Sequence, residues 1–239
     1  MINELKWDSE FFGKKIGELT LDFESLPQSE AFIGKAKEDG FKYITCKLQS
    51  QQANIIRALE LFGFHLSDIG VTWAVETEQF IYKNVTTNFE IRKSIAVATD
   101  KDIPMLKEIA KSLFGDSRFY SDPFFSKEEA DNLYQTWVEN SVKGAVADIV
   151  FCIPDKGFIT CKKSKNNSGE IVLIGIRKDC RGEGFGLSLV EKAIKWFITQ
   201  SINHVSVRTQ LKNLNAMNFY VKLGFRIEGY DIVFGKILQ

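Results

Sequence analysis

A short apolar run, a glycine-rich turn and a long amphipathic stretch follow one another over residues 170–196, and this succession constrains the fold most. The run Ile171–Ile176 is apolar and rich in β-branched residues, which predicts a buried strand. After the turn, apolar residues recur at helical spacing up to Phe197. Glycines let phosphates approach the backbone closely, and the free amides at a helix start favour negative charge. The sequence therefore predicts an anion-binding strand–loop–helix unit.

Residues 181–186, RGEGFG, do not match the two best-known phosphate loops. A Rossmann loop would follow the first strand of its unit and precede an acidic residue by about 20 positions, whereas Asn203–Gln210 contains no acid. A Walker A loop ends in Gly-Lys-Ser/Thr, which these residues lack. The remaining pattern, R-x-x-G-x-G after a strand, resembles the pyrophosphate-binding motif of the GCN5-related N-acetyltransferases (the GNAT family). A glycine-rich turn that binds nothing is the alternative.

The elements predicted around this loop follow the order of the GNAT fold, so the resemblance covers the C-terminal part of the chain. Thr99 and Asp102 are expected to form an acidic capping box at one helix start. We therefore expect an α/β protein with a mixed, strongly twisted sheet flanked by helices. The predicted elements are strand Phe89–Val97, helices Ile103–Phe114 and Lys127–Val142, strands Ala145–Ile153, Gly157–Lys163 and Glu170–Ile176, the helix after the loop, strand His204–Gln210, helix Asn213–Leu223, and strands Phe225–Tyr230 and Ile232–Leu238.

Residues 1–88 are predicted to form a smaller, incomplete GNAT-like α/β domain, and residues 89–239 the catalytic GNAT domain. Tyr43–Phe64 aligns without gaps on His204–Phe225, which suggests a partial internal repeat. A chance likeness of two strand–helix units is the alternative. The first unit has no counterpart of the glycine loop, so we expect it to be scaffold. Its predicted elements are a strand or hairpin over Phe11–Gly13 and Ile16–Phe23, helix Ser29–Glu38, strand Phe41–Leu48, helix Gln51–Phe62 and two short strands up to Glu76.

Composition narrows the class of function. Thirty-one basic residues balance 31 acidic residues, which argues against a nucleic-acid partner. The 4 cysteines form no C-x-x-C pair, which excludes a recognisable zinc site and predicts reduced core thiols. The N-terminal MINELKWDSEFFGKK has no signal-peptide core, and no apolar run reaches membrane-spanning length. We therefore expect a cytoplasmic protein without a membrane partner, and a homodimer through a C-terminal strand is a further expectation.

The GNAT resemblance implies acetyl-CoA as the co-substrate and no metal. In that family, backbone amides of a splayed strand hold the pantetheine arm and polarise the thioester, and the matching residues here are Ile174 and Ile176. The family tyrosine that protonates the CoA sulfur falls on Tyr220, and a phenol with a pKa of about 10 keeps its proton at neutral pH. The resemblance assigns the remaining pyrophosphate and pantetheine contacts to Arg181, Gly182, Glu183, Gly184, Phe185, Gly186 and Asn213.

Each of these assignments has a structural alternative. The alternative for Tyr220 is a half-buried tyrosine that bonds the backbone, and the alternative for Asn213 is a helix N-cap. The general base is open as well. His65 lies in the first unit, His204 starts a strand, and Glu170 is expected to lie too far from the end of its strand to reach an amine. We therefore expect deprotonation through water or with weak assistance.

Two further segments resemble a narrower group. Trp7–Gly13 resembles a W-x-x-x-F-F-G opening, and Ser117–Tyr120 with Trp137–Gly144 resembles an S-R-F … W-x-E-N-x-x-x-G segment. Both occur in the dTDP-fucosamine acetyltransferases of bacterial surface-polysaccharide synthesis, which acetylate the 4-amino group of a dTDP-linked 4-amino-4,6-dideoxyhexose. The resemblance implies direct transfer in a ternary complex. The side chains expected to stack on the base and pair with a phosphate are Arg118, Phe119 and Tyr120.

Three alternatives stay open. A GNAT enzyme that acts on a protein N-terminus, a lysine or a small metabolite amine would not respond to dTDP-sugars. A non-catalytic acyl-CoA-binding module would bind CoA without turnover. On the acceptor side, residues 118–120 can instead belong to an aromatic loop that only packs beneath the helices.

Overall fold

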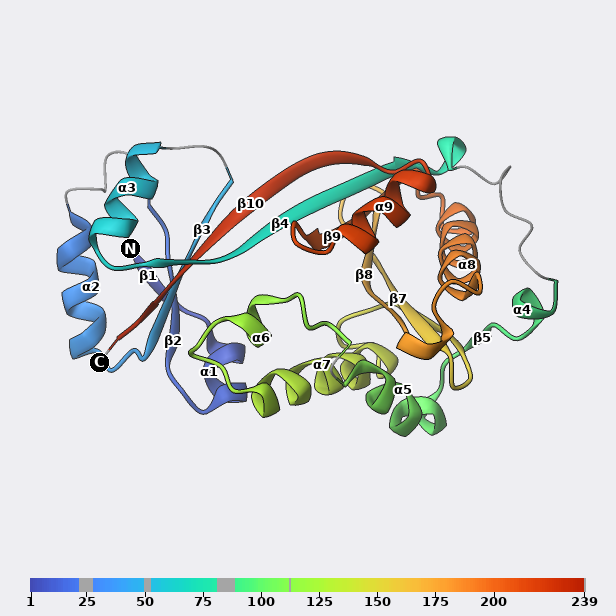
Figure 1. Ribbon diagram of the computed structural model, residues 1–239, viewed down its shortest axis with the longest axis horizontal. Coiled ribbons are helices and arrows are strands. Elements are labelled where there is room, and N and C mark those ends of the chain that lie inside the picture. The colour runs from blue at the N-terminus through green and yellow to red at the C-terminus, as the bar shows by residue number, and fades with distance from the viewer. Residues whose placement is uncertain (22–27, 50–52, 81–88, 112, 239) are drawn as a thin grey trace.

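The computed structural model describes residues 1–21, 28–49, 53–80, 89–111 and 113–238 (Figure 1). The described strands form one sheet of mixed direction, in the order β1-β2-β3-β10-β4-β9-β8-β7-β6-β5. The predicted α/β class with a mixed sheet flanked by helices is confirmed. The strands are β1 Ile2–Glu4, β2 Ile16–Leu19, β3 Tyr43–Leu48, β4 His65–Glu76, β5 Ala96–Val97, β6 Ile149–Ile153, β7 Gly157–Lys163, β8 Ser168–Ile176, β9 His204–Gln210 and β10 Arg226–Ile237.

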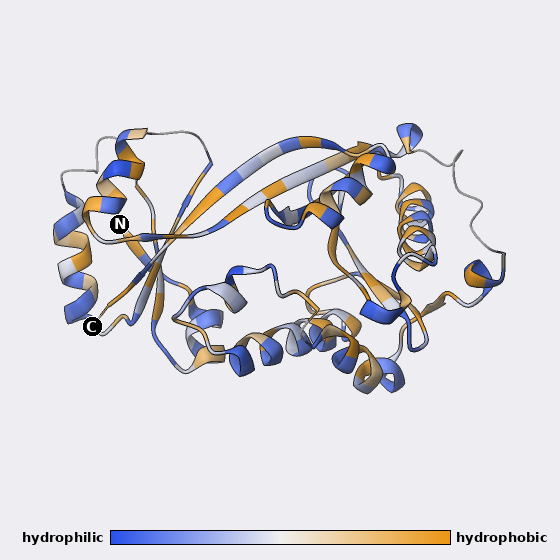
Figure 2. Ribbon diagram, viewed as in Figure 1, coloured by the Kyte–Doolittle hydropathy of each residue, from blue (hydrophilic) through white to orange (hydrophobic). Residues whose placement is uncertain are grey.

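Helices cover both faces of this sheet (Figure 1). Helices α1, α5 and α7 share one core with β2, β3 and the strands around β7, whereas α2 and α3 cover the opposite face at the N-terminal end, and α8 and α9 cover it near β8 and β9. Figure 2 shows the strands near β7 and β8 as largely hydrophobic, as a doubly covered sheet requires. The helices are α1 Lys6–Phe12, α2 Ser29–Glu38, α3 Ala53–Leu61, α4 Phe89–Lys93, α5 Ile103–Ala110, α6 Arg118–Ser121, α7 Lys127–Val142, α8 Phe185–Thr199 and α9 Leu214–Lys222.

Side-chain capping sets two of the helix starts. Ser126 and Glu129 form a reciprocal capping box at the start of α7, with the Glu129 amide donating to the Ser126 hydroxyl at 3.1 Å. The predicted box of Thr99 and Asp102 is also confirmed, and it caps a 3₁₀ turn that leads into α5. These local interactions explain why the start of α7 could be predicted from sequence.

The two long strands β4 and β10 are exchanged between the halves of the molecule. β4 pairs with β9, and β10 pairs with β3, so Glu76 lies opposite His204 and Ile237 lies opposite Tyr43. The two strands also pair antiparallel with each other (Figure 1). Residues before and after the glycine loop at 181–186 therefore belong to one continuous sheet at the middle of the molecule.

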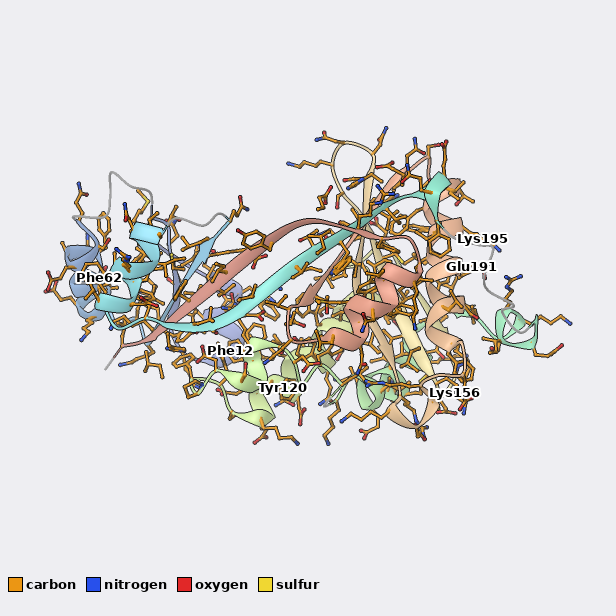
Figure 3. The ribbon with its side chains drawn as sticks, turned by 45° about the horizontal axis from the view of Figure 1, so that its top comes forward. Phe12, Phe62, Tyr120, Lys156, Glu191 and Lys195 are labelled. Atoms are coloured by element: carbon orange, nitrogen blue, oxygen red, sulfur yellow. The ribbon has the colours of Figure 1, made fainter. Side chains whose placement is uncertain are left out.

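Several predicted elements differ from the structure. Phe89–Val97, predicted as a strand, is the helix α4 followed by the two-residue strand β5. Arg92 of α4 donates to both carboxylate oxygens of Glu191 on α8 (Figure 3 labels Glu191), at 2.8 and 3.1 Å, a tertiary contact that no local pattern reveals. The predicted strand at Phe11–Gly13 is the end of α1 and its left-handed cap.

The predicted pairs of short strands also differ. His65–Glu76 and Arg226–Ile237 are each one strand of 12 residues. β10 stays paired with β4 across a register shift near Gly229, and it also pairs with β3 from Ile232 onward. The helix predicted up to Phe114 ends at Ala110. The predicted ends at Phe23 and Gln51 and the division at residue 88 lie outside the described residues.

Candidate active site

Strands β8 and β9 start as a parallel pair and then separate. Their pairing runs from Ser168 opposite His204 to Ile171 opposite Val207. Beyond that point β8 continues to Ile176 and is paired only with β7, where Ile176 lies opposite Gly157. The predicted splay of this strand is confirmed, and it leaves one backbone edge of β8 open.

The open edge presents the amides of Ile174 and Ile176. The Leu173 amide donates to the Thr160 hydroxyl on β7 at 2.9 Å, so that amide points to the paired side. Because successive residues of a strand alternate in direction, the amides of Ile174 and Ile176 point to the open side. Such donors can pair with an extended amide chain or polarise a carbonyl oxygen.

The glycine loop forms a cradle at the end of this strand. Gly182 and Gly184 have φ of +86° and +90°, a region that favours glycine, and a Cβ added at either would meet no atom within 4 Å. Gly184 is the N-cap of α8, so no side chain caps the first amides of that helix. Open space beside uncapped amides suits a diphosphate, and the residues present fit that part of acetyl-CoA.

A single cleft of about 1460 Å³ connects this cradle to the sheet face beneath α6 and α7. At the cradle end, the predicted residues that line the cleft are Ile174, Ile176, Arg181, Gly182, Gly184, Phe185, Gly186, Asn213 and Tyr220. At the far end Arg118 and Phe119 line it. Glu183 and Tyr120 do not belong to its described wall, and the Tyr120 hydroxyl donates to Asp131 at 2.6 Å (Figure 3 labels Tyr120). The structure thus brings both sets together in one space.

Tyr220 lies two residues before the end of α9 and belongs to the core beneath that helix. It lines the cleft although only 3% of its surface is exposed, and it packs against Trp73 and Phe225. Burial raises the pKa of its phenol well above the ordinary value. The hydroxyl therefore stays protonated across the neutral range and is available as a proton donor.

Asn213 caps the helix that carries Tyr220. Its side-chain oxygen accepts a hydrogen bond from the Ala216 amide at 3.1 Å, so the N-cap alternative is borne out. The same residue lines the cleft. The cap fixes the start of α9 and with it the position of Tyr220, two turns later.

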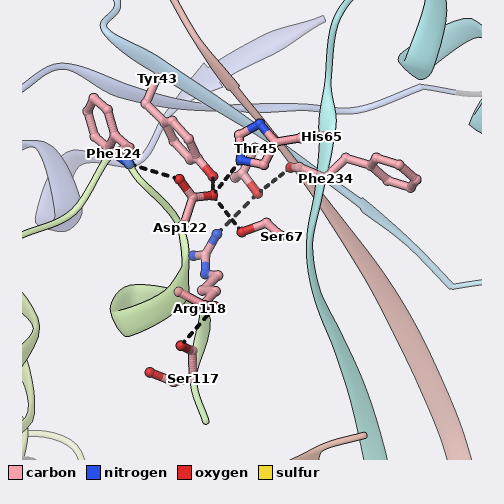
Figure 4. Close-up of polar contacts among 10 residues, drawn as sticks. Tyr43, Thr45, His65, Ser67, Ser117, Arg118, Asp122, Phe124 and Phe234 are labelled. Atoms are coloured by element: carbon pink, nitrogen blue, oxygen red, sulfur yellow. Dashed lines mark hydrogen bonds and ion pairs between the residues drawn. The ribbon is translucent and has the colours of Figure 1, made fainter. Parts of the chain in front are cut away.

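A polar network beside the far end of the cleft joins the end of α6 to β3 and β4 (Figure 4). Asp122, which is 3% exposed, accepts hydrogen bonds from Tyr43 at 2.5 Å, Ser67 at 2.7 Å and His65 at 2.9 Å. Burial alone would raise the pKa of Asp122, but these hydrogen bonds outweigh it and lower the pKa. The network holds α6 against β3 and β4.

Arg118 is positioned by the same arrangement. Its guanidinium donates to the Thr45 hydroxyl at 3.2 Å and lies 4.7 Å from the Phe119 ring centroid (Figure 4 shows Arg118 and Thr45). Thr45 in turn donates to the Phe234 carbonyl at 3.2 Å. Thr45 of β3 therefore orients the Arg118 side chain at the far end of the cleft.

A model of the acetyltransferase (GNAT) family matches residues 106–225, which is half of the chain. The chain belongs to this family. Membership makes it an acyl-CoA-dependent N-acetyltransferase, and the family uses acetyl-CoA. The GNAT fold expected from the sequence is confirmed.

Individual GNAT proteins are similar to this chain over different lengths. A dTDP-fucosamine acetyltransferase of Escherichia coli is 24% identical over 239 residues, 95% of this chain and 94% of that protein. Streptothricin acetyltransferase A of Bacillus subtilis is 32% identical over 114 residues, 47% of this chain and 64% of that protein. The structure of a GCN5-related N-acetyltransferase from Sphaerobacter thermophilus matches with a TM-score of 0.63 at 13% identity, over 93% of this chain and 73% of that one.

The GNAT cleft also contains charged residues that sequence analysis did not single out. They lie on one face of β3, β4, β9 and β10, because alternate residues of a strand share a face. Lys47 and Arg208 occupy aligned positions of the internal repeat, and this was the available signal. The charged side chains of this floor are Lys47, Asp68, Arg208 and Asp231.

The candidate bases lie in different places. Glu170 lines the cleft, at the level where β8 and β9 are still paired. His65 bonds Asp122, and His204 lies 2.9 Å from both Glu76 and Glu228.

Among the described residues, no group of three or more His, Cys, Asp or Glu side chains is arranged to hold a metal ion. No described helix combines the length and apolarity needed to cross a membrane.

Proposed function

We propose that this GNAT enzyme transfers an acetyl group from acetyl-CoA to the amino group of a nucleotide-linked amino sugar of the dTDP-4-amino-4,6-dideoxyhexose class, in polysaccharide synthesis. The supporting observation is that likeness to the Escherichia coli dTDP-fucosamine acetyltransferase extends over nearly the whole of both chains. The segments that carry the narrower resemblance, at Trp7 and at Ser117–Phe119, both line the acceptor end of the cleft.

In the proposed mechanism the chain orients two substrates for direct transfer. Acetyl-CoA supplies a thioester whose carbonyl carbon is electrophilic. The amides of Ile174 and Ile176 hold the pantetheine arm and polarise the carbonyl, the loop 181–186 holds the diphosphate, and Asn213 adds a pantetheine contact. Tyr220 donates a proton to the leaving sulfur. Arg118 pairs with an acceptor phosphate and Phe119 stacks on the base.

The test follows free thiol and the mass of the product. The purified protein is incubated with acetyl-CoA and dTDP-4-amino-4,6-dideoxygalactose, with the 4-hydroxy analogue as the matched control. We expect thiol release and acetylated product with the amine alone, and intersecting initial-velocity lines as direct transfer requires. Absence of turnover with retained CoA binding would reject the sugar assignment.

A small cationic amine is the second candidate acceptor. Away from the glycine loop, the carboxylates of the cleft wall (Asp8, Glu18, Asp68, Asp116, Glu170 and Asp231) outnumber the cations Lys47, Arg118 and Arg208. An excess of negative charge favours a positively charged substrate. The likeness to streptothricin acetyltransferase A is consistent with such an acceptor. The same thiol assay with lysine and spermidine distinguishes it.

A further inference from the structure

Two buried carboxylates on the cleft floor, Asp68 of β4 and Asp231 of β10, have different partners. Asp231 accepts hydrogen bonds from Arg208 at 2.6 and 3.0 Å, and Lys47 lies 3.5 Å away. Asp68 lies 3.8 Å from the same guanidinium, which is too long for a hydrogen bond. Asp231 thus pairs with two cations, whereas Asp68 accepts a hydrogen bond from the Ile69 amide and lines the cleft without a hydrogen bond from Arg208.

Strand registers place Asp68 beside the splayed strand. Gly70 lies opposite Gln210, so continuing the β4–β9 register by two residues brings Asp68 level with Lys212. The β8–β9 pairing ends earlier, at Ile171 opposite Val207, so β8 has already separated from β9 at this level. Asp68 lines the same cleft as Ile174 and Ile176 of the separated strand.

The surroundings of Asp68 favour a proton acceptor. Asp68 is 8% exposed, and burial raises its pKa, an effect that the Arg208 charge only partly offsets. The pKa of Asp68 is also lowered by a hydrogen bond from the Ile69 amide and by the charges of Arg118 on α6 and Lys212 after β9. Tyr134 of α7 is close enough to interact with the Asp68 charge. By contrast, hydrogen bonds from Arg208 outweigh burial at Asp231 and lower the pKa of that carboxyl. Neighbouring carboxyl groups whose pKa values are shifted in opposite directions are typical of acid–base catalytic sites.

We propose that Asp68, a residue of the N-terminal unit, receives the ammonium group of the acceptor and removes its proton. This inference rests on the proposed acetyl transfer but not on the identity of the acceptor. The first unit then supplies a catalytic residue in addition to its structural role.

The proposed step balances within the residues described. The acceptor ammonium gives one proton to the Asp68 carboxylate, and the nitrogen lone pair forms a bond to the acyl carbon. The carbon–sulfur bond breaks, and its electron pair stays on sulfur, which takes a proton from Tyr220. The nitrogen then loses its second proton, which leaves the neutral amide and restores Tyr220 through water, and Asp68 releases its proton to water.

Two other cleft carboxylates are rivals. Asp8 of α1 also has a pKa raised by burial, but the charges that act on it come from Arg118 and from Glu18 on β2. In the sheet order β2 is separated from β9 by three strands, so Asp8 lies at the outer end of the cleft. Glu170 lies opposite Ser206, where β8 and β9 have not yet separated.

The test compares the pH dependence of kcat/KM in Asp68→Asn with that in Asp8→Asn and Glu170→Gln. A carboxylate base makes kcat/KM fall as the pH drops through its pKa. We expect Asp68→Asn to lower kcat/KM by about 100-fold and to remove that acidic limb, with an unchanged Kd for CoA. The two rival variants are expected to keep the limb. Loss of the limb in either rival instead, or an Asp68→Asn profile like wild type, would overturn the proposal.

Folding and acceptor identity are separated by further measurements. Should Asp68→Asn not fold, Asp68→Glu keeps a carboxylate one methylene further out, and we expect a lower kcat with an acidic limb retained; wild-type kcat would overturn the proposal. If wild type acetylates lysine or spermidine instead of the dTDP-sugar and Asp68→Asn loses this activity, the sugar assignment is rejected and the role of Asp68 is supported. If wild type acetylates the dTDP-sugar and Asp68→Asn retains this activity, the sugar assignment is supported and the role of Asp68 is rejected. No turnover of any amine by wild type would overturn both proposals.

Discussion

The segments β3–α3–β4 and β9–α9–β10 have the same construction and different environments. Both helices have 9 residues and both second strands have 12, and each second strand pairs with the first strand of the other segment. The strand before each segment differs. β2 ends at Leu19, whereas β8 runs on to Ile176 beyond its last pair with β9. The open backbone that can hold acyl-CoA exists only in the second arrangement of the described chain.

The comparison of the two segments shows that substitutions at a few positions can give the same backbone arrangement a different role. Leu59 of α3 is fully buried, and its aligned residue in α9 is Tyr220, which adds a hydroxyl at the cleft. Tyr43 bonds the buried Asp122, and its aligned residue His204 lies between surface carboxylates. The exchange of β4 and β10 then places part of the first unit in the active site of the second. Duplication stays a prediction, and the equal element lengths support it.

The largest expected effect is on stability, and it distinguishes Arg208 from Lys47, the two cations at matching positions of the internal repeat. Arg208→Ala would leave the 5% exposed Asp231 without its bidentate partner, so we expect a loss of about 3–5 kcal/mol in the free energy of unfolding. Lys47→Ala removes a cation that is 44% exposed, so we expect a loss below about 1 kcal/mol. Urea denaturation measures both. Equal losses of stability in the two variants would mean that Arg208 and Lys47 contribute equally, which would contradict the prediction.

The second effect distinguishes Tyr220 from Leu59. Tyr220→Phe keeps the ring in place and removes the proposed acid, so we expect kcat to fall by about 100-fold with little change in Tm. Leu59→Ala opens a cavity, so we expect a loss of about 2–5 kcal/mol in stability with kcat of the folded enzyme unchanged. A Tyr220→Phe enzyme with wild-type kcat would reduce α9 to the same packing role as α3.

The third effect compares two glycines with left-handed backbone. Gly184→Ala and Gly40→Ala each force an alanine into positive φ, +90° and +83°, with open space at the added Cβ. We expect each to cost about 1–2 kcal/mol of stability. Only Gly184→Ala is expected to raise the Kd for CoA, by about tenfold or more, because it disturbs amides that bond a charged group. Calorimetric titration with CoA tests this, and an equal change in Gly40→Ala would contradict it.

The smallest effect concerns pH. Hydrogen bonding to Glu76, with help from Glu228, raises the pKa of His204. The folded state therefore holds this proton more tightly than the unfolded chain, and the extra stability is present below about pH 6.5 and is lost as pH rises through the raised pKa. Because the pairs are exposed, we expect less than about 1 kcal/mol. His204→Ala should lack this decline.

The matched variant for that measurement is Tyr43→Phe. Burial and the Asp122 hydrogen bond raise the pKa of Tyr43, so its phenol does not titrate near neutral pH. We expect Tyr43→Phe to lower stability by a similar amount at about pH 6 and about pH 8, and to retain the wild-type slope. A flat wild-type profile between these values would contradict the role given to His204.

Local patterns were sufficient for the parts of the fold that local chemistry determines. The strand, glycine loop and helix over 170–196 follow from apolar periodicity and glycine placement, and α7 follows from its capping box. The strand predicted at Phe89–Val97 was wrong: Phe89–Lys93 is a helix, and its Arg92 pairs with Glu191 of α8, 99 positions later in the chain. The sequence thus identified the glycine loop at one end of the cleft through residues adjacent in the chain.

The sequence by itself determined the α/β class, the family and the cradle at residues 181–186, because contiguous backbone carries each of these features. Only the tertiary structure decided that β4 and β10 cross between the halves and that Asp68, Arg208 and Asp231 meet on one floor. Strand exchange depends on pairing energies between residues more than 100 positions apart, and such pairings leave no local periodicity. A buried carboxylate then acquires its properties from neighbours that only the completed sheet supplies.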